Sequence, residues 1–205
     1  MIDLTKLTYL CHSSFKLASD NGAILYIDPF VEVGMEEHAD LILVTHEHFD
    51  HNQTQLLHKN ADCVEIHACH ALLQGVFVPA EFHGYQVSAV PACNANHDPA
   101  ECVGYMVEVD GKKLYFAGDT STTECMGTDL AAMHLDYAFL PCDGVFNMDV
   151  EEASACARLI GARHSVPIHT TPVSCAADCG FDRAKAEAFD CPGKLILEPG
   201  AEIEL

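Results

Sequence analysis

The chain has 205 residues, and its 49% hydrophobic and 20% charged content indicates a globular protein with a substantial core, not a disordered or fibrous one. Ten Lys and Arg against 31 Asp and Glu give a formal charge of -21, which repels phosphate backbones and anionic lipid surfaces. We therefore expect one domain over residues 1–205, with no nucleic-acid partner and no membrane partner.

Short apolar segments separated by turn residues predict many strands along the chain. The segment 41–45 is a continuous apolar run of strand length, which is typical of a strand covered on both faces. Asp110-Gly111 lies between two of the segments and is a strong hairpin signal. The predicted strands are 5–10, 15–18, 23–27, 41–45, 63–66, 86–90, 103–109, 113–117, 137–140 and 165–168.

Three helices are expected between these strands. Asp149 can cap the first, with Glu152 in the capping-box position, an apolar stripe after it and Gly161 at its end. A second helix is predicted at 183–189, and 67–73 is a third, short candidate that ends near a glycine. Strands followed by a helix, in two successive rounds, indicate an α+β fold with packed sheets and helices outside.

Eleven cysteines are a high and odd number, so complete pairing within the chain is excluded. The two that are closest in sequence, Cys175 and Cys179, are too few for a structural zinc site without further ligands. Because no secretory signal is visible at the N-terminus, we expect reduced thiols and a cytoplasmic location. No apolar stretch approaches the ~20 residues that span a bilayer.

The densest group of potential metal ligands follows directly on the apolar strand at 41–45. His46, His48, Asp50 and His51 lie within six residues. A chain leaving a strand can turn so that His46 and His48 point to one side while the other two point to a neighbouring position. Imidazole and carboxylate bind Zn and also Mn, Fe or Ni, so this segment can contribute to two metal sites.

Three further candidates, His97, Asp119 and His169, also come just after predicted strands. Gly118 precedes Asp119 and allows the backbone to turn closely at this point. Each residue alone is a weak signal, but together they are expected to converge on one sheet edge.

This ordered set resembles the signature of the metallo-β-lactamase fold superfamily, and the match covers nearly the whole chain. Segments 8–15, 27–30 and 140–148 are similar to small bacterial metal-dependent hydrolases of the ascorbate-phosphate lactonase type. One departure is Asp143-Gly144, where relatives have paired glycines. The resemblance implies a four-layer αββα sandwich of two mixed β-sheets flanked by helices, with a dinuclear metal site at one sheet edge.

The resemblance also implies a ligand set. One metal ion would be held by His46, His48 and His97, the other by Asp50, His51 and His169, with Asp119 bridging them. The expected cofactors are two divalent metal ions, Zn first, with Mn or Fe fitting the same ligands. A hydroxide bridging the metals would attack the substrate, and catalytic Asp50 would orient it and protonate the leaving group.

Three more residues are candidates for contacting the substrate or supporting a ligand. Asp28 can accept the outer N–H of a ligand histidine, although Asp28-Pro29 can also be a simple turn. His12 is either a site residue or a solvent-exposed loop histidine. Asn147 lies, together with Asp143, in a segment that approaches the active site in relatives.

We therefore expect a metal-dependent hydrolase that cleaves a small lactone, ester or phosphoester. A phosphodiesterase or nuclease of the same fold is the alternative, and a non-catalytic metal-binding protein is a third hypothesis. Flavodiiron oxidoreductases of this fold have Glu at the position of His48, which disfavours a redox role. The chain has three arginines, which are too few to bind successive phosphates of a nucleic acid, so a small-molecule substrate is expected.

Overall fold

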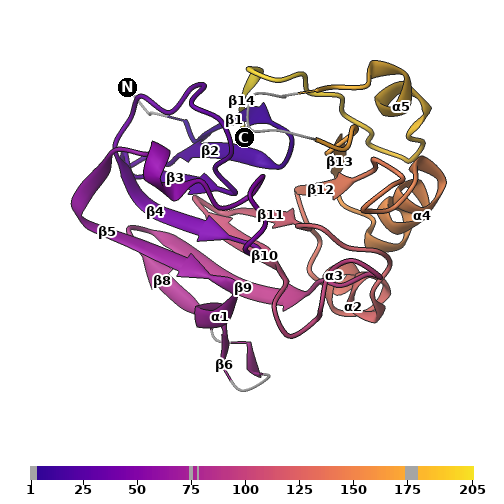
Figure 1. The fold of residues 1–205 in the computed structure, drawn as a ribbon, viewed down its shortest axis with the longest axis horizontal. Helices are drawn as coiled ribbons and strands as arrows, with labels where there is room; N and C mark the ends of the chain where they lie inside the picture. Colours follow the sequence, from indigo (N-terminus) through magenta and orange to yellow (C-terminus); the bar gives the residue numbers. More distant parts are fainter. Residues whose placement is uncertain (1–3, 74–75, 78, 174–179) are drawn as a thin grey trace.

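The structure, a computed structural model, describes residues 4–73, 76–77, 79–173 and 180–205 and contains two six-stranded sheets packed face to face (Figure 1). The first sheet has the order β14-β1-β2-β3-β4-β5. Its pairs are antiparallel from β14 to β3 and parallel from β3 to β5. The strands are β1 (Lys6–Cys11), β2 (Ser14–Ala18), β3 (Ile24–Ile27), β4 (Ala39–Val44), β5 (Lys59–His67) and β14 (Glu202–Glu204).

The second sheet has the same mixed character, with the order β13-β12-β11-β10-β9-β8. Here β13, β12 and β11 are parallel, and the pairs from β11 to β8 are antiparallel. Its strands are β8 (Ala80–Phe82), β9 (Tyr85–Pro91), β10 (Val103–Val109), β11 (Lys112–Phe116), β12 (Tyr137–Pro141) and β13 (His164–Ile168). The expected pair of mixed sheets is thereby confirmed, as is the Asp110-Gly111 hairpin between β10 and β11, where both residues have positive φ.

The main core lies between the two sheets, and β4 shows how the sequence pattern produces it. Leu41 and Leu43 point into this core, while Ile42 packs on the opposite face of the sheet. That outer face is covered by Met35 and Leu57, which come from loops, and the only helical element near it among the described residues is the 3₁₀ turn η1 (Thr54–Leu56). Both faces of β4 are therefore buried, as its continuous apolar run predicts.

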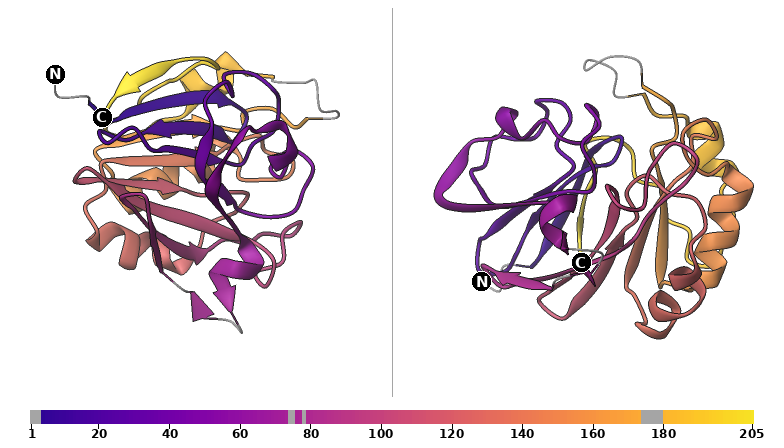
Figure 2. Two further views of the ribbon diagram at one scale, coloured as in Figure 1. Left: turned by 90° about the vertical axis from the view of Figure 1, so that its left-hand side faces the viewer. Right: turned by 60° about the horizontal axis from the view of Figure 1, so that its bottom comes forward.

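The outer face of the second sheet is covered by helices, most visibly by α4 (Figure 2). As expected, Asp149 caps α4 by accepting from the backbone N–H of Glu152, and Gly161 ends it at φ 65°. The Glu152 carboxylate does not complete a capping box, because it accepts from Thr122 instead. The helices in this layer are α2 (Glu124–Gly127), α3 (Asp129–Ala132), α4 (Val150–Ile160) and α5 (Arg183–Ala188).

The helix expected at 67–73 is much shorter than predicted. β5 continues through His67, which also caps the four-residue helix α1 (Ala68–Ala71). After it, β6 (Leu72–Leu73) pairs with β7 (Val76–Phe77), and this pairing ends the helix early. The glycine predicted to end it, Gly75, lies outside the described residues, as do Cys175 and Cys179.

Two further observations concern the described part of the chain. Its nine cysteines carry free thiols. None of its helices is long and apolar enough to cross a membrane.

Candidate metal centre

The seven candidate ligands meet at one edge of the sandwich because each follows a strand end. His46, His48, Asp50 and His51 lie on the loop after β4, and His97, Asp119 and His169 follow β9, β11 and β13. Three groups of these side chains have all their ligand atoms within 4.8 Å of one another, and one of the groups includes His12. The sequence prediction that these residues converge is thus correct.

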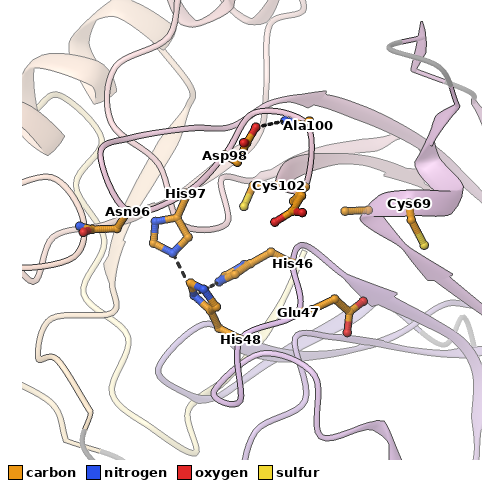
Figure 3. Close-up of a pocket in the computed structure, with 11 residues that line it drawn as sticks. His46, Glu47, His48, Cys69, Asn96, His97, Asp98, Ala100 and Cys102 are labelled. Carbon is orange, nitrogen blue, oxygen red and sulfur yellow. Dashed lines mark hydrogen bonds between the residues drawn. The ribbon is translucent and has the colours of Figure 1, made fainter.

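His46, His48 and His97 form the first group, and their ring nitrogens point toward one another (Figure 3). Nδ1 of His48 lies 3.1 Å from Nε2 of His46 and 3.2 Å from Nε2 of His97. Burial holds the pKa of His46 well below its ordinary value and also lowers that of His97. These two imidazoles are therefore neutral at pH 7, as metal ligation requires.

Asp50, His51 and His169 form the second group. Oδ2 of Asp50 lies 4.0 Å from Nε2 of His51 and 4.0 Å from Nε2 of His169. His12 belongs to this group: it is 1% exposed, and its Nε2 lies 3.1 Å from Oδ2 of Asp50. The hypothesis of a solvent-exposed loop histidine at position 12 is wrong.

Asp119 lies between the two groups and is 3% exposed. Its Oδ1 is 3.4 Å from Nε2 of His51, and its Oδ2 is 3.4 Å from Nε2 of His97 and 3.5 Å from Nε2 of His169. Burial alone would raise the pKa of Asp119, but the histidines hold it well below its ordinary value. Its ionised carboxylate can thus serve both groups.

The outer nitrogens of two ligand histidines contact buried carboxylates. Nδ1 of His51 lies 2.9 Å from Oδ2 of Asp28, whose two oxygens also accept from the N–H and hydroxyl of Thr45. Nδ1 of His169 lies 3.0 Å from Oδ2 of Asp143. Such contacts orient the imidazole and leave Nε2 facing the metal site. Of the two hypotheses for Asp28, the structure favours the one in which it supports a ligand.

Asp143, which the resemblance places near the site without a role, and Asn94, which carries no sequence signal, both support ligand histidines. Oδ1 of Asn94 lies 2.8 Å from Nδ1 of His97, so it supports that histidine as Asp143 supports His169. Asn147 is connected to the site through Asp143, because its side-chain amide donates to the carboxylate that contacts His169. A carboxylate just past the end of β12 repeats the position of Asp28 after β3, and this repetition is the signal that could have identified Asp143.

The backbone at the site is held in an uncommon conformation. His12, Asp28 and His169 have φ values of 55°, 45° and 44°, in the left-handed region that side chains other than glycine rarely adopt. Gly118 has φ 62°, and a Cβ there would lie 2.9 Å from the carbonyl oxygen of Val103. The predicted need for glycine beside Asp119 is thus explained by both conformation and space.

The donor set fits divalent metal ions. Three buried atoms that face the centre, Nε2 of His51, Oδ1 of Asp119 and Nε2 of His169, have no hydrogen-bond partner. Leaving such atoms unpaired is costly, and a cation between the groups would satisfy all of them. Imidazole nitrogens and carboxylate oxygens in this proportion suit Zn and related ions.

Two cavities adjoin the centre and share Glu47, His48, Asn96 and His97. One, of about 460 Å³, is also lined by Cys69, Asp98, Glu101 and Cys102, and Figure 3 shows Cys69 and Asp98 on different sides of it. The other, of about 390 Å³, reaches Asp50 and Asp119 and is walled by Phe49, Phe146 and Val173. The candidate ligands are therefore accessible to a small molecule.

Comparisons with known proteins agree with this geometry. The family model described as "Beta-lactamase superfamily domain" matches residues 6–169. A UPF0173 metal-dependent hydrolase from Methanoregula boonei is 33% identical, with 97% of each chain covered. A putative metal-dependent hydrolase structure from Parabacteroides distasonis aligns with a TM-score of 0.73 at 25% identity, covering 94% of this chain and 92% of that one. A metallo hydrolase from Ignicoccus hospitalis has the same fold, with a TM-score of 0.73 at 23% identity and 99% of each chain covered.

The chain therefore belongs to the metallo-β-lactamase superfamily. It is a metal-dependent hydrolase, related over nearly its full length to the UPF0173 hydrolases.

Proposed function

We propose that this hydrolase holds two divalent metal ions and cleaves a small lactone, ester or phosphoester. The ligands would be His46, His48 and His97 for one ion, Asp50, His51 and His169 for the other, and Asp119 for both. The observation that carries the proposal is the placement of Asp119 within 3.5 Å of histidines from both groups, with buried lone pairs facing the space between them.

When bound, the two metal ions would lower the pKa of a shared water and supply a hydroxide nucleophile at neutral pH. The chain's own residues then position and move the proton. Burial would raise the pKa of Asp50, but His12 and His51 hold it well below its ordinary value, so its carboxylate is ionised and can accept a proton. Asp50 borders the smaller cavity, where it can pass that proton to the leaving group.

The imidazole-rich ligand set favours zinc as the metal, and Mn or Fe fit the same residues. The charge of -21 favours a small-molecule substrate over a long polyanion, which would have to lie across an acidic surface. The free thiols of the nine described cysteines suit a reducing compartment and support a cytoplasmic location.

The experiment is metal reconstitution followed by a substrate panel. Chelator-treated protein is titrated with zinc and with manganese, and bound metal is counted per chain. Lactones, carboxylic esters and phosphodiesters are then tested with the native protein and with Asp50→Ala. We expect two metals per chain and chelator-sensitive hydrolysis that is lost in the variant. Fewer than one tight metal per chain contradicts the proposal, and hydrolysis of phosphodiesters alone favours the nuclease alternative.

A further inference from the structure

The substrate-binding surface beside the metal centre is apolar on one side and acidic on the other. On this basis, and resting on the proposed function, we propose that the enzyme cleaves carboxylic esters with an uncharged, apolar arm and disfavours anionic substrates, phosphoesters included. In the reaction, the hydroxyl of water joins the acyl carbon, the acyl carbon–oxygen bond breaks, and a proton goes to the departing oxygen. The products are a carboxylic acid and an alcohol.

The apolar side is formed by Phe49, Phe146 and Val173 in the cavity of about 390 Å³. Phe49 is 46% exposed and Phe146 is 45% exposed, although both belong to a residue type that is usually buried. Exposed aromatic side chains next to a reactive centre are typical of a binding surface for an apolar group.

Phe146, which forms one wall of this cavity, is held in place by the same residues that support the ligand histidines. Its backbone N–H donates to Asp143, which lies against His169. Its carbonyl accepts from Asn94, which lies against His97. The wall and the metal ligands are therefore fixed relative to each other, as a preorganised substrate site requires.

The acidic side is formed by Glu47, Asp98 and Glu101, which line the larger cavity. Glu47 also lines the smaller one. All three carboxylates are exposed to solvent. Anions that approach the centre meet these charges first.

Both cavities also lack a positive side chain among the residues that the structure describes. All ten Lys and Arg of the chain are in the described ranges, so the undescribed positions add none. Lys185 lines neither cavity, and its ammonium donates to the carbonyl of Asp143. An anionic arm would thus lie near carboxylates and phenyl rings with no Lys or Arg to pair with, and burying it there is unfavourable.

The metal ions would attract the reacting group of any of these substrates. The rest of the substrate, its arm, therefore decides which substrate the enzyme prefers. Binding can be tested without turnover using a matched pair of probes, N-phenyl-1-naphthylamine and its 8-sulfonate, on zinc-loaded protein. We expect the uncharged probe to bind at least tenfold more tightly. Phe146→Ala should weaken its binding several-fold, whereas the adjacent control Val145→Ala, which lines neither cavity, should not.

Turnover is tested with p-nitrophenyl hexanoate and the mono-p-nitrophenyl ester of adipic acid, which share a six-carbon acyl chain and differ in one carboxylate. p-Nitrophenyl phosphate is the third substrate. We expect kcat/KM for the hexanoate to exceed that for the adipate at least tenfold. Glu47→Lys should reduce this ratio, and Glu81→Lys, an equal charge change on β8 outside both cavities, should leave it unchanged.

The outcomes separate this inference from the proposed function. Equal or faster chelator-sensitive cleavage of the adipate or the phosphate overturns the inference and leaves the hydrolase proposal standing. Equal binding of the two probes, or binding that Phe146→Ala does not change, also overturns it. Absence of chelator-sensitive hydrolysis of every substrate in this set and in the panel above overturns the proposed function, and the inference that rests on it falls as well.

Discussion

Oδ2 of Asp28 lies 2.9 Å from Nδ1 of His51, and both side chains are buried. The contact turns Nε2 of His51 toward Asp119, at 3.4 Å from its Oδ1. Burial raises the pKa of Asp28, while the contacts with His51 and Thr45 oppose that rise. The buried carboxylate thus orients a ligand, and replacing it should affect the metal site more than the fold.

The first prediction concerns Asp28→Asn. The amide keeps an oxygen for the N–H of Thr45 but is a weaker acceptor for His51, so metal affinity at the second group should fall about 10–100-fold. Competition with a chromophoric chelator measures this affinity. Asp62→Asn, at an exposed carboxylate on β5, is the matched control and should leave it unchanged. Equal loss of both metals in Asp28→Asn would show that the carboxylate supports the fold and not His51.

The second prediction separates the catalytic role of Asp50 from metal holding. Asp50→Ala should lower kcat by about 10²–10⁴-fold, because the group that accepts and returns the proton is lost. The group of His46, His48 and His97 contains no atom of Asp50, so at least one tightly bound metal per chain should remain. Metal analysis of the dialysed variant beside its steady-state rate tests both parts. A variant with full activity contradicts the assigned role.

The third prediction concerns the backbone beside Asp119. Gly118→Ala forces a side chain into φ 62° and places its Cβ 2.9 Å from the carbonyl oxygen of Val103 and 3.0 Å from Cβ of Thr45. Gly22→Ala is the matched control, since Gly22 has φ 87° with no atom within 4 Å of the added Cβ. The left-handed conformation alone costs roughly 1–2 kcal/mol, so Gly118→Ala should lower the free energy of unfolding by more than this and more than Gly22→Ala. Urea unfolding with chelator present compares the two; equal losses would rule out the packing argument.

Much of this architecture can be predicted from local sequence. The apolar run of β4 and the Asp110-Gly111 turn each carry their own signal within a few residues. The same holds for the ligand candidates, because histidines directly after strand ends form a pattern that is visible without a structure. The short elements α2, α3, β8 and β14 were missed, since three or four residues carry too little periodicity to be distinguished from loops.

The residues that support the ligands are harder to predict because their partners are distant in sequence. Asp143 meets His169 only when β12 and β13 pair in parallel, which brings the ends of these strands together. Asn94 is close to His97 in the chain, but its sequence neighbourhood is that of an ordinary turn. The roles of His12 and Asp28 stayed open in the sequence for the same reason, and their burial against Asp50 and His51 resolves them.

The last prediction concerns protons released when metal binds. In the metal-free protein, burial would lower the pKa of His169, but Asp119 and Asp143 raise it to about 10. The pKa of His51 is raised as well, by Asp119 and Asp28 against the effect of burial. A metal ion at the second group must therefore displace protons across neutral pH, whereas His46 and His97 are already neutral.

Affinity at the second group should rise about tenfold per pH unit for each displaced proton between pH 7 and 9, while affinity at the first group stays nearly constant. Because the pKa of His169 is raised in the folded state, the contribution of this residue to the stability of metal-free protein should be fully present below pH ~6.5 and be lost as pH rises through about 10. Calorimetric titrations in buffers of different ionisation enthalpy count the protons released in each step. Asp143→Asn removes a charge that holds the His169 proton, so it should reduce the number of protons released on metal binding at pH 8. Equal numbers of protons released in both binding steps would contradict the assignment of His169 to the proton-releasing group.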